Sequence, residues 1–261
     1  MLILLGLSLD TLRGFEAAAR LRGFCGGART WAAPTRRRAS RQLATLDGQR
    51  AKLALEHGQH MLEKARERTV HSGAMSPDMK QRHGHLVESL IDLQDDIRLL
   101  VIGRVGEDST RSAQSLGSQI EAVVRTIHRP ILITTSHFRK PETVMVAFDG
   151  SATGHKTVQM LASSPLCEGL PIHIVMVGTD SEDNQNALEK ARTTLASSGS
   201  LVHTEIRPGE VESALHAYQA EHGIDLLVMG AYGHSRIRQF LIGSTTTTML
   251  RTSTVPVLLL R

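Results

Sequence analysis

The stretch that decides the fold is residues 226–244, LLVMGAYGHSRIRQFLIGS. Its uncharged apolar start predicts a buried strand, and Gly230 and Gly233 predict a tight loop directly after it. Gly243 and Ser244 then open a segment with helical potential. Glycines let the backbone approach a ligand closely, and the N–H groups and dipole at a helix N-terminus attract anions. The segment therefore predicts a strand, a phosphate-binding loop and a helix.

An earlier part of the chain repeats this pattern, which indicates two related domains. The offset between corresponding landmarks is 126 or 127 residues throughout. Polar residues and a proline interrupt the apolar pattern between Ser136 and Pro141. We therefore predict a first domain at 1–138 and a second at 139–261. The matching segments are LLVIGRVG at 99–106 with LLVMGAYG at 226–233, LGS at 116–118 with IGS at 242–244, and RPILI at 129–133 with VPVLL at 255–259.

In the second copy, short apolar runs alternate with segments of helical period. Such alternation predicts an open five-stranded parallel sheet with helices on both faces, a Rossmann-like α/β fold. Ligands of such sheets bind beyond the carboxyl ends of the strands, where the strand order reverses. The expected strands are 144–148, 172–177, 202–206, 226–229 and 255–260.

The first copy is expected to have the same fold in a degenerate form. Its last two strands are legible at 99–102 and 131–135, and residues 3–9 could form its first strand. By the spacing of the second copy, the second strand should begin near residue 33. Residues 32–36, AAPTR, are a poor strand, and residues 41–70 have the pattern of a long charged helix.

The composition is that of a folded protein and argues against a nucleic-acid partner. Hydrophobic residues make up 41% and charged residues 21% of the chain. Aromatic residues are only 3%, too few for a surface that stacks single-stranded bases. The net charge of +4 arises from an arginine-rich segment, residues 1–38, whereas the remainder is close to neutral. A nucleic-acid site requires a basic face on the folded body, so we expect none.

The cysteines and the apolar N-terminus favour a cytoplasmic protein without a membrane partner. Cys25 and Cys167 lie far apart, as is typical of reduced thiols rather than of a disulfide framework. The apolar run at 1–9 is too short to span a bilayer, and its arginines follow the run instead of preceding it as in a signal peptide.

Neither a metal site nor a dedicated hydrolase site is expected. Among thirteen histidines, the pairs His57/His60 and His83/His85 lack a third ligand at a recognised spacing. No nucleophile elbow or Cys/His pair is present, so no catalytic residue is assigned.

The G-x2-G-x9-G-[ST] pattern, the VAFDGS stretch at 146–151, the VPV stretch at 255–257 and the tandem repeat resemble the universal stress protein family. The resemblance implies an adenine-nucleotide-binding α/β domain of the adenine nucleotide alpha hydrolase-like fold that pairs with a second copy. It also implies ATP, with or without magnesium, as the ligand. It places Asp149 on the ribose, Ala147 and Val177 near the adenine, and Met229 beside the ribose. The remaining residues that it implies contact the phosphates: Gly230, Gly233, Gly243, Ser244 and Thr245.

The first copy departs from this pattern. Ten residues instead of nine separate Gly106 from Gly117, and Glu107 and Asp108 in the loop would repel a phosphate. We therefore predict that this half does not bind ATP well and acts as a structural or regulatory partner. The last strands of the two copies, 131–135 and 257–261, are expected to be edge strands that pair with each other, as in this family.

These features predict a stress-response protein that binds ATP in its C-terminal domain and acts as a nucleotide-linked regulator or sensor. Its expected partners are the nucleotide, an unidentified protein and a second copy of the chain in a homodimer. Two alternatives stay open: a slow ATPase or nucleotidyl transferase that uses the same loop, and a dimerising scaffold that binds no nucleotide.

Overall fold

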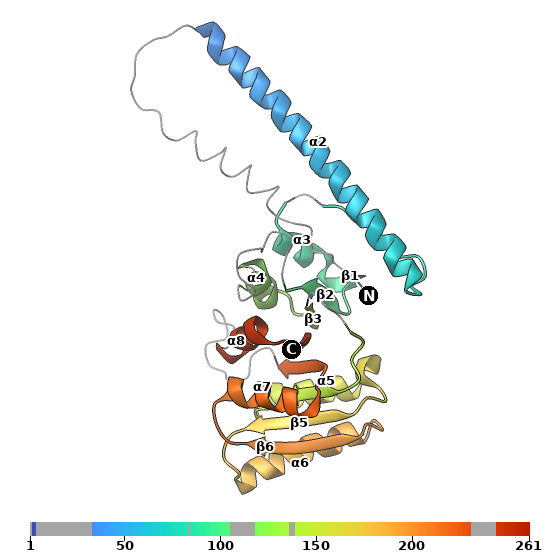
Figure 1. Cartoon of the computed structure of the whole chain (residues 1–261), viewed down its shortest axis with the longest axis vertical. Helices are drawn as coiled ribbons and strands as arrows, with labels where there is room; N and C mark the ends of the chain where they lie inside the picture. Colours follow the sequence, from blue (N-terminus) through green and yellow to red (C-terminus); the bar gives the residue numbers. More distant parts are fainter. Residues whose placement is uncertain (1, 4–32, 83, 105–117, 136–138, 231–243) are drawn as a thin grey trace, which may run out of the picture. The chain divides into compact units, whose positions relative to one another are not determined.

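A computed structural model of the chain describes residues 2–3, 33–82, 84–104, 118–135, 139–230 and 244–261 (Figure 1). By its internal contacts the chain divides into two compact units, residues 1–4 with 84–261, and residues 5–83. Both sequence repeats contribute to one sheet, which lies in the first unit. The predicted boundary between residues 138 and 139 falls inside that unit and stays a prediction.

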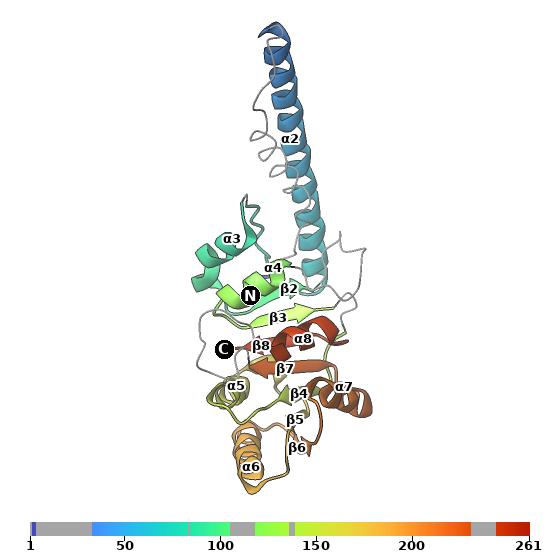
Figure 2. The same ribbon diagram turned by 90° about the vertical axis from the view of Figure 1, so that its left-hand side faces the viewer.

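The sheet contains eight strands in the order β1-β2-β3-β8-β7-β4-β5-β6 (Figure 2). All neighbours are parallel except β3 and β8, which are antiparallel. The strands are β1 (Leu2–Ile3), β2 (Leu100–Gly103), β3 (Ile131–Thr134), β4 (Val144–Ala147), β5 (Ile172–Val177), β6 (Val202–Arg207), β7 (Leu226–Gly230) and β8 (Val257–Leu260).

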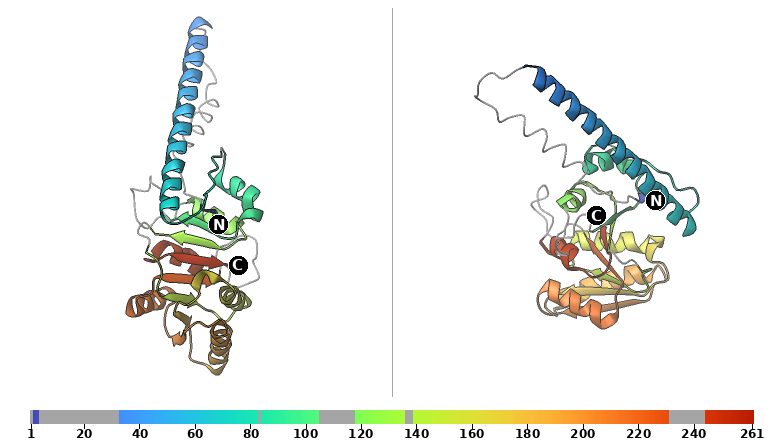
Figure 3. Two further views of the ribbon diagram at one scale, coloured as in Figure 1. Left: turned by 90° about the vertical axis from the view of Figure 1, so that its right-hand side faces the viewer. Right: turned by 45° about the horizontal axis from the view of Figure 1, so that its top comes forward.

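Helices connect the parallel strands and cover both faces, as Figures 2 and 3 show for α7 on one side and for α5 and α6 on the other. The helices of this unit are α3 (Leu86–Leu93), η2 (Gln94–Asp96), α4 (Ser118–Thr126), α5 (Ala152–Ala162), η3 (Pro165–Cys167), α6 (Glu182–Ala196), α7 (Val211–His222) and α8 (Ser244–Thr252). No helix in the described residues is long and apolar enough to cross a membrane.

Two apolar layers hold these helices against the sheet. One buries Leu215 of α7, Leu250 of α8 and Val124 of α4 against strand residues of both repeats. The other buries Leu161 of α5 and Leu195 of α6 against the C-terminal strands. The predicted α/β fold, with helices on both faces of a parallel sheet, is confirmed for the C-terminal repeat, which has all five predicted strands in the order β8-β7-β4-β5-β6.

The N-terminal repeat contributes three strands among the described residues, where five were expected. β1 (Leu2–Ile3) overlaps the predicted strand at 3–9 only at Ile3, and residues 4–9 lie outside the described ones. Where the second strand was expected, near residue 33, helix α2 (Ala33–His71) begins. Pro34, which weakened the strand pattern, occupies the first turn of that helix. N–H groups in a first turn make no hydrogen bond within the helix, so a proline there costs none. The long charged helix predicted at 41–70 is confirmed.

The predicted pairing of the two terminal strands is also confirmed. Ile131, Leu132 and Ile133 of β3 are in register with Leu259, Leu258 and Val257 of β8. All four residues of β8 are buried.

Polar contacts between the repeats add to the β3–β8 ladder. Arg251 of α8 lies 3.1 Å from Glu121 of α4, the Arg104 guanidinium donates to the Ser253 carbonyl, and Arg261 donates to the Ile127 carbonyl at 2.6 Å. The two repeats therefore share one core and one sheet.

We predict that Leu259→Ala lowers the free energy of unfolding by about 2–5 kcal/mol, because its side chain is buried at the seam and truncation leaves a cavity. Urea denaturation measures the change. Leu201→Ala is the control, since Leu201 is 64% exposed and its truncation should cost less than about 0.5 kcal/mol. Equal losses in the two variants would contradict the buried seam.

Candidate functional site

The candidate site lies where the order of the C-terminal strands reverses. From β4 the chain proceeds through α5 to β5 on one side, whereas β7 flanks β4 on the other side. Ligands of open α/β sheets bind in the crevice beyond the carboxyl ends of such a strand pair. Ala147 of β4 is in register with Met229 of β7, so both lie at that edge.

Asp149 follows β4 and stands exposed at the edge of this crevice. Its Oδ1 accepts hydrogen bonds from the Ser151 backbone N–H at 3.0 Å and from the Ser151 hydroxyl at 2.6 Å. The Ser151 oxygen in turn caps α5 by accepting from the Gly154 N–H at 3.0 Å. The helix cap therefore fixes one carboxylate oxygen of Asp149. The other oxygen, Oδ2, makes no hydrogen bond within the described residues. The carboxylate is thus held in place to accept from a ligand hydroxyl.

Gly230 ends β7 on the opposite side of the crevice, and its place in the fold has a packing reason. A Cβ at this position would lie 3.1 Å from Thr153 Cγ2 and 3.1 Å from Thr157 Oγ1, both on α5. The close approach of α5 to β7 therefore favours glycine at residue 230 independently of any ligand.

The N-terminus of α8 is the anion-attracting element of this edge. The helix begins at Ser244 and leads into β8, which is parallel to β7, so by topology its first turn lies at the carboxyl ends of the strands. Thr245, in that first turn, is exposed. The unpaired N–H groups of a first helical turn and its dipole favour negative charge. The loop before the helix, including Gly233 and Gly243, lies outside the described residues.

The predicted adenine contacts occupy the adjacent strand ends. Val177 ends β5 and is half-buried, as is Ala147, whereas Met229 is 5% exposed. The structure thus brings Ala147, Asp149, Val177, Met229 and Gly230 to one edge of three neighbouring strands. Of the corresponding N-terminal region, Gly103 at the end of β2 is described, and residues 105–117 lie outside the described ones.

A cluster of histidines lies on the α7 side of the sheet and was not predicted from the sequence. His173 of β5 and His203 of β6 are in register, with ring centroids 4.9 Å apart. The His173 ring lies 5.3 Å from that of His222 on α7, and its Nδ1 is 2.8 Å from the Tyr218 hydroxyl. The strand register and the packing of α7 bring these residues together. Neither can be read from the spacing of the residues in the sequence.

Burial in this cluster lowers the pKa of His173 below its usual value, and the neighbouring His203 and His222 lower it further, with an opposing effect of Glu205. Among the described residues, no group of three or more His, Cys, Asp or Glu side chains has a geometry that could hold a metal ion. His57 and His60 are exposed on α2, and His83 lies outside the described residues.

Cys167 is 2% exposed, and burial raises the pKa of its thiol to about 11. A thiol in this state stays protonated at neutral pH and is a poor nucleophile. Cys167 therefore packs as a small buried apolar residue.

The chain is similar in sequence to one family of known proteins. The model of the universal stress protein family matches residues 171–261. Universal stress protein Slr1230 of Synechocystis sp. is 37% identical over 223 residues, which cover 85% of this chain and 78% of that protein.

Solved structures share the fold at low sequence identity. A universal stress protein from Archaeoglobus fulgidus has a TM-score of 0.66 at 21% identity, covering 82% of this chain and 79% of its own. A structure described as a putative universal stress protein from Pseudomonas aeruginosa has a TM-score of 0.57 at 16% identity, covering 99% and 91%.

We predict that Ser151→Ala destabilises the protein by about 1 kcal/mol, because it removes the cap of α5 and a bond that holds Asp149. Ser151→Thr keeps a capping hydroxyl and should lie within a few tenths of a kcal/mol of the wild type. Urea denaturation of the three proteins provides the test, and an unchanged midpoint in Ser151→Ala would contradict the role of the cap.

We also predict that stability falls as the pH drops below about 6.5, the reference value of histidine. The pKa of His173 is lowered in the folded protein, so as the pH falls the unfolded chain takes up a proton at this histidine before the folded chain does. The stability that His173 contributes above about pH 6.5 is therefore lost as the pH falls through the folded pKa. His203→Gln removes a cause of the lowering and should reduce the loss of stability between pH 7.5 and 5.5.

The matched control for this prediction is His57→Gln, the same change at an exposed histidine. Urea midpoints at the two pH values are compared. If His203→Gln loses as much stability between pH 7.5 and 5.5 as His57→Gln and the wild type do, the histidine cluster does not produce the pH dependence.

Proposed function

The chain belongs to the universal stress protein family, and from this premise we propose that its C-terminal half binds ATP in the crevice between β4 and β7. Binding, rather than turnover, is the proposed output. A bound nucleotide can shift a protein between conformations or partners only through differential affinity, so the ligand would report the energy state of the cell. The protein would thus act as a nucleotide-linked regulator in a stress response.

The observation that carries this proposal is the opposition of two kinds of polar group across one crevice. The exposed Asp149 carboxylate, fixed by Ser151, accepts hydrogen bonds as a ribose diol requires. The first turn of α8, with Ser244 and Thr245, supplies N–H donors and positive dipole as phosphates require. Half-buried Ala147 and Val177 offer apolar contact for a base. These described groups fit an adenine nucleotide.

Gly233 and Gly243 complete the proposed phosphate loop by sequence. Their spacing from Ser244 supports the proposal, because a glycine-rich loop before a helix exposes successive N–H groups to an anion. The N-terminal half is proposed to bind no ATP, since Glu107 and Asp108 add negative charge where the phosphates would lie.

We predict that Asp149→Ala weakens ATP binding about tenfold or more, because it removes a charge-assisted hydrogen bond of about 1.5–3 kcal/mol. Isothermal titration of the full chain with ATP and magnesium gives the affinity. Asp183→Ala, the same change at an exposed aspartate of α6, should bind as the wild type does. Gly243→Val should abolish binding by blocking the loop. Absence of binding to the wild type would sink the ATP proposal.

A second measurement separates the regulator from a slow ATPase or nucleotidyl transferase. We predict that ATP incubated with the protein stays intact over hours, because the sequence contains no nucleophile elbow or Cys/His pair. Steady release of phosphate or pyrophosphate above that of Gly243→Val would favour the enzyme instead. If the Gly243→Val variant keeps its activity in cells, the alternative of a scaffold that binds no nucleotide is favoured.

A further inference from the structure

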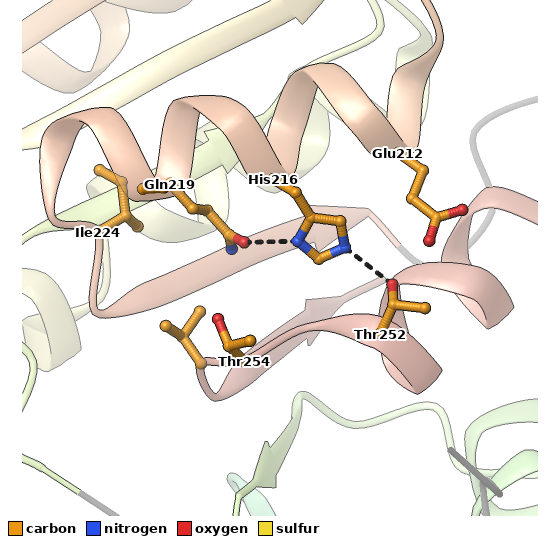
Figure 4. Close-up of a pocket in the computed structure, with 8 residues that line it drawn as sticks. Glu212, His216, Gln219, Ile224, Thr252 and Thr254 are labelled. Atoms are coloured by element: carbon orange, nitrogen blue, oxygen red, sulfur yellow. Dashed lines mark hydrogen bonds between the residues drawn. The ribbon is translucent and has the colours of Figure 1, made fainter. Parts of the chain in front are cut away.

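An open cavity of about 450 Å³ lies between α7 and the end of α8 (Figure 4). Its volume is within the range of small-molecule sites. Ala220, Ile224 and Val255 provide apolar lining. Glu212, His216 and Gln219 project into it from one face of α7, as expected for residues at positions i, i+4 and i+7.

The decisive group is the amide of Gln219, whose side chain is 6% exposed. Its Oε1 lies 3.1 Å from His216 Nδ1, whereas its Nε2 is buried without a hydrogen-bond partner. A buried polar group without a partner costs roughly 1–3 kcal/mol. An amide held at a cavity in this way is therefore a group to which a ligand can bind.

Counting protons shows that the amide keeps an unused half whichever way it is turned. The Thr252 hydroxyl donates to the Thr248 carbonyl at 3.0 Å, so it must accept from His216 Nε2 at 2.9 Å. A charged His216 also donates through Nδ1 to Gln219 Oε1 and leaves the amide NH₂ to the cavity. A neutral His216 accepts at Nδ1, which turns the amide and leaves its carbonyl to the cavity.

The charges of the lining select the rest of the ligand. Glu212 brings a carboxylate, and the described residues of the lining include no lysine or arginine. On α8, Arg251 precedes Thr252, but its guanidinium lies 3.1 Å from Glu121. The site therefore disfavours anions, and it differs in this respect from the proposed nucleotide crevice. Glu212 and Gln219 are seven residues apart on α7, about 10 Å along the helix axis.

We infer that the cavity between α7 and α8 is a binding site for a small organic cation with an apolar body. An amide or hydroxyl group of the ligand pairs with Gln219, and an ammonium group about 10 Å away faces Glu212. This site does not depend on the proposed ATP site, because the two use different residues on different parts of the fold.

The test uses three probes on the full-length chain: 4-(aminomethyl)benzamide, 4-methylbenzamide without the ammonium group, and the anion 4-carbamoylbenzoate. NMR titration should show saturable binding, tightest for 4-(aminomethyl)benzamide and weakest for the anion. In the wild type, the side-chain amide resonances of Gln219 should shift with the same saturation curve. No saturable shift with 4-(aminomethyl)benzamide overturns the inference.

Variants then identify the groups that hold the probe. Gln219→Leu should weaken 4-(aminomethyl)benzamide about fivefold, the equivalent of one hydrogen bond. Gln159→Leu, the same change at an exposed residue of α5 on the other face of the sheet, should bind as the wild type does. Glu212→Gln should remove the preference for the ammonium over the uncharged probe.

Equal affinity of Gln219→Leu and Gln159→Leu contradicts the inference, as does an unchanged probe preference in Glu212→Gln. Asp149→Ala should leave probe binding intact. A failure of ATP binding with retained probe binding would therefore count against the proposed function alone.

Discussion

The antiparallel pairing of β3 with β8 is the constraint on which the rest of the unit formed by residues 1–4 and 84–261 depends. Each strand is the last of its repeat and would otherwise expose a row of unpaired N–H and C=O groups. Pairing satisfies these groups and joins the three described strands of the N-terminal repeat to the five of the C-terminal repeat in one sheet. It also brings α4 beside α8, where Glu121 and Arg251 meet. The N-terminal repeat, with three described strands, thereby shares the core of the five-stranded repeat.

The same topology places the candidate nucleotide site. Because β5 and β6 lie on one side of β4, and β7 and β8 on the other, the strand order reverses between β4 and β7. The carboxyl ends of these two strands therefore border one crevice. Asp149 follows β4 and Gly230 ends β7. The cap of α5 by Ser151 links the stability of this helix to the position of the Asp149 carboxylate. Local folding and the proposed function therefore depend on the same side chains.

The sequence predicted the C-terminal fold because its signals are local. Runs such as 172–177 and 226–229 are largely apolar on both faces, as buried parallel strands are. The resemblance to the universal stress protein family implied the pairing of 131–135 with 257–261. The start of α2 at Ala33 was not predicted, because the spacing of the second copy led us to seek a strand there. The histidines of β5, β6 and α7 and the Gln219 cavity depend on register and helix packing, which a single sequence does not encode locally.

A single nucleotide site is proposed for a chain built from two repeats, so the most direct test is to count the nucleotides that it binds. Native mass spectrometry of the full chain with ATP and magnesium measures the number bound per chain. We expect one ATP per chain, in the C-terminal half. Two per chain would contradict the assignment of the N-terminal repeat as a non-binding partner, and none at saturating ATP would contradict the site itself.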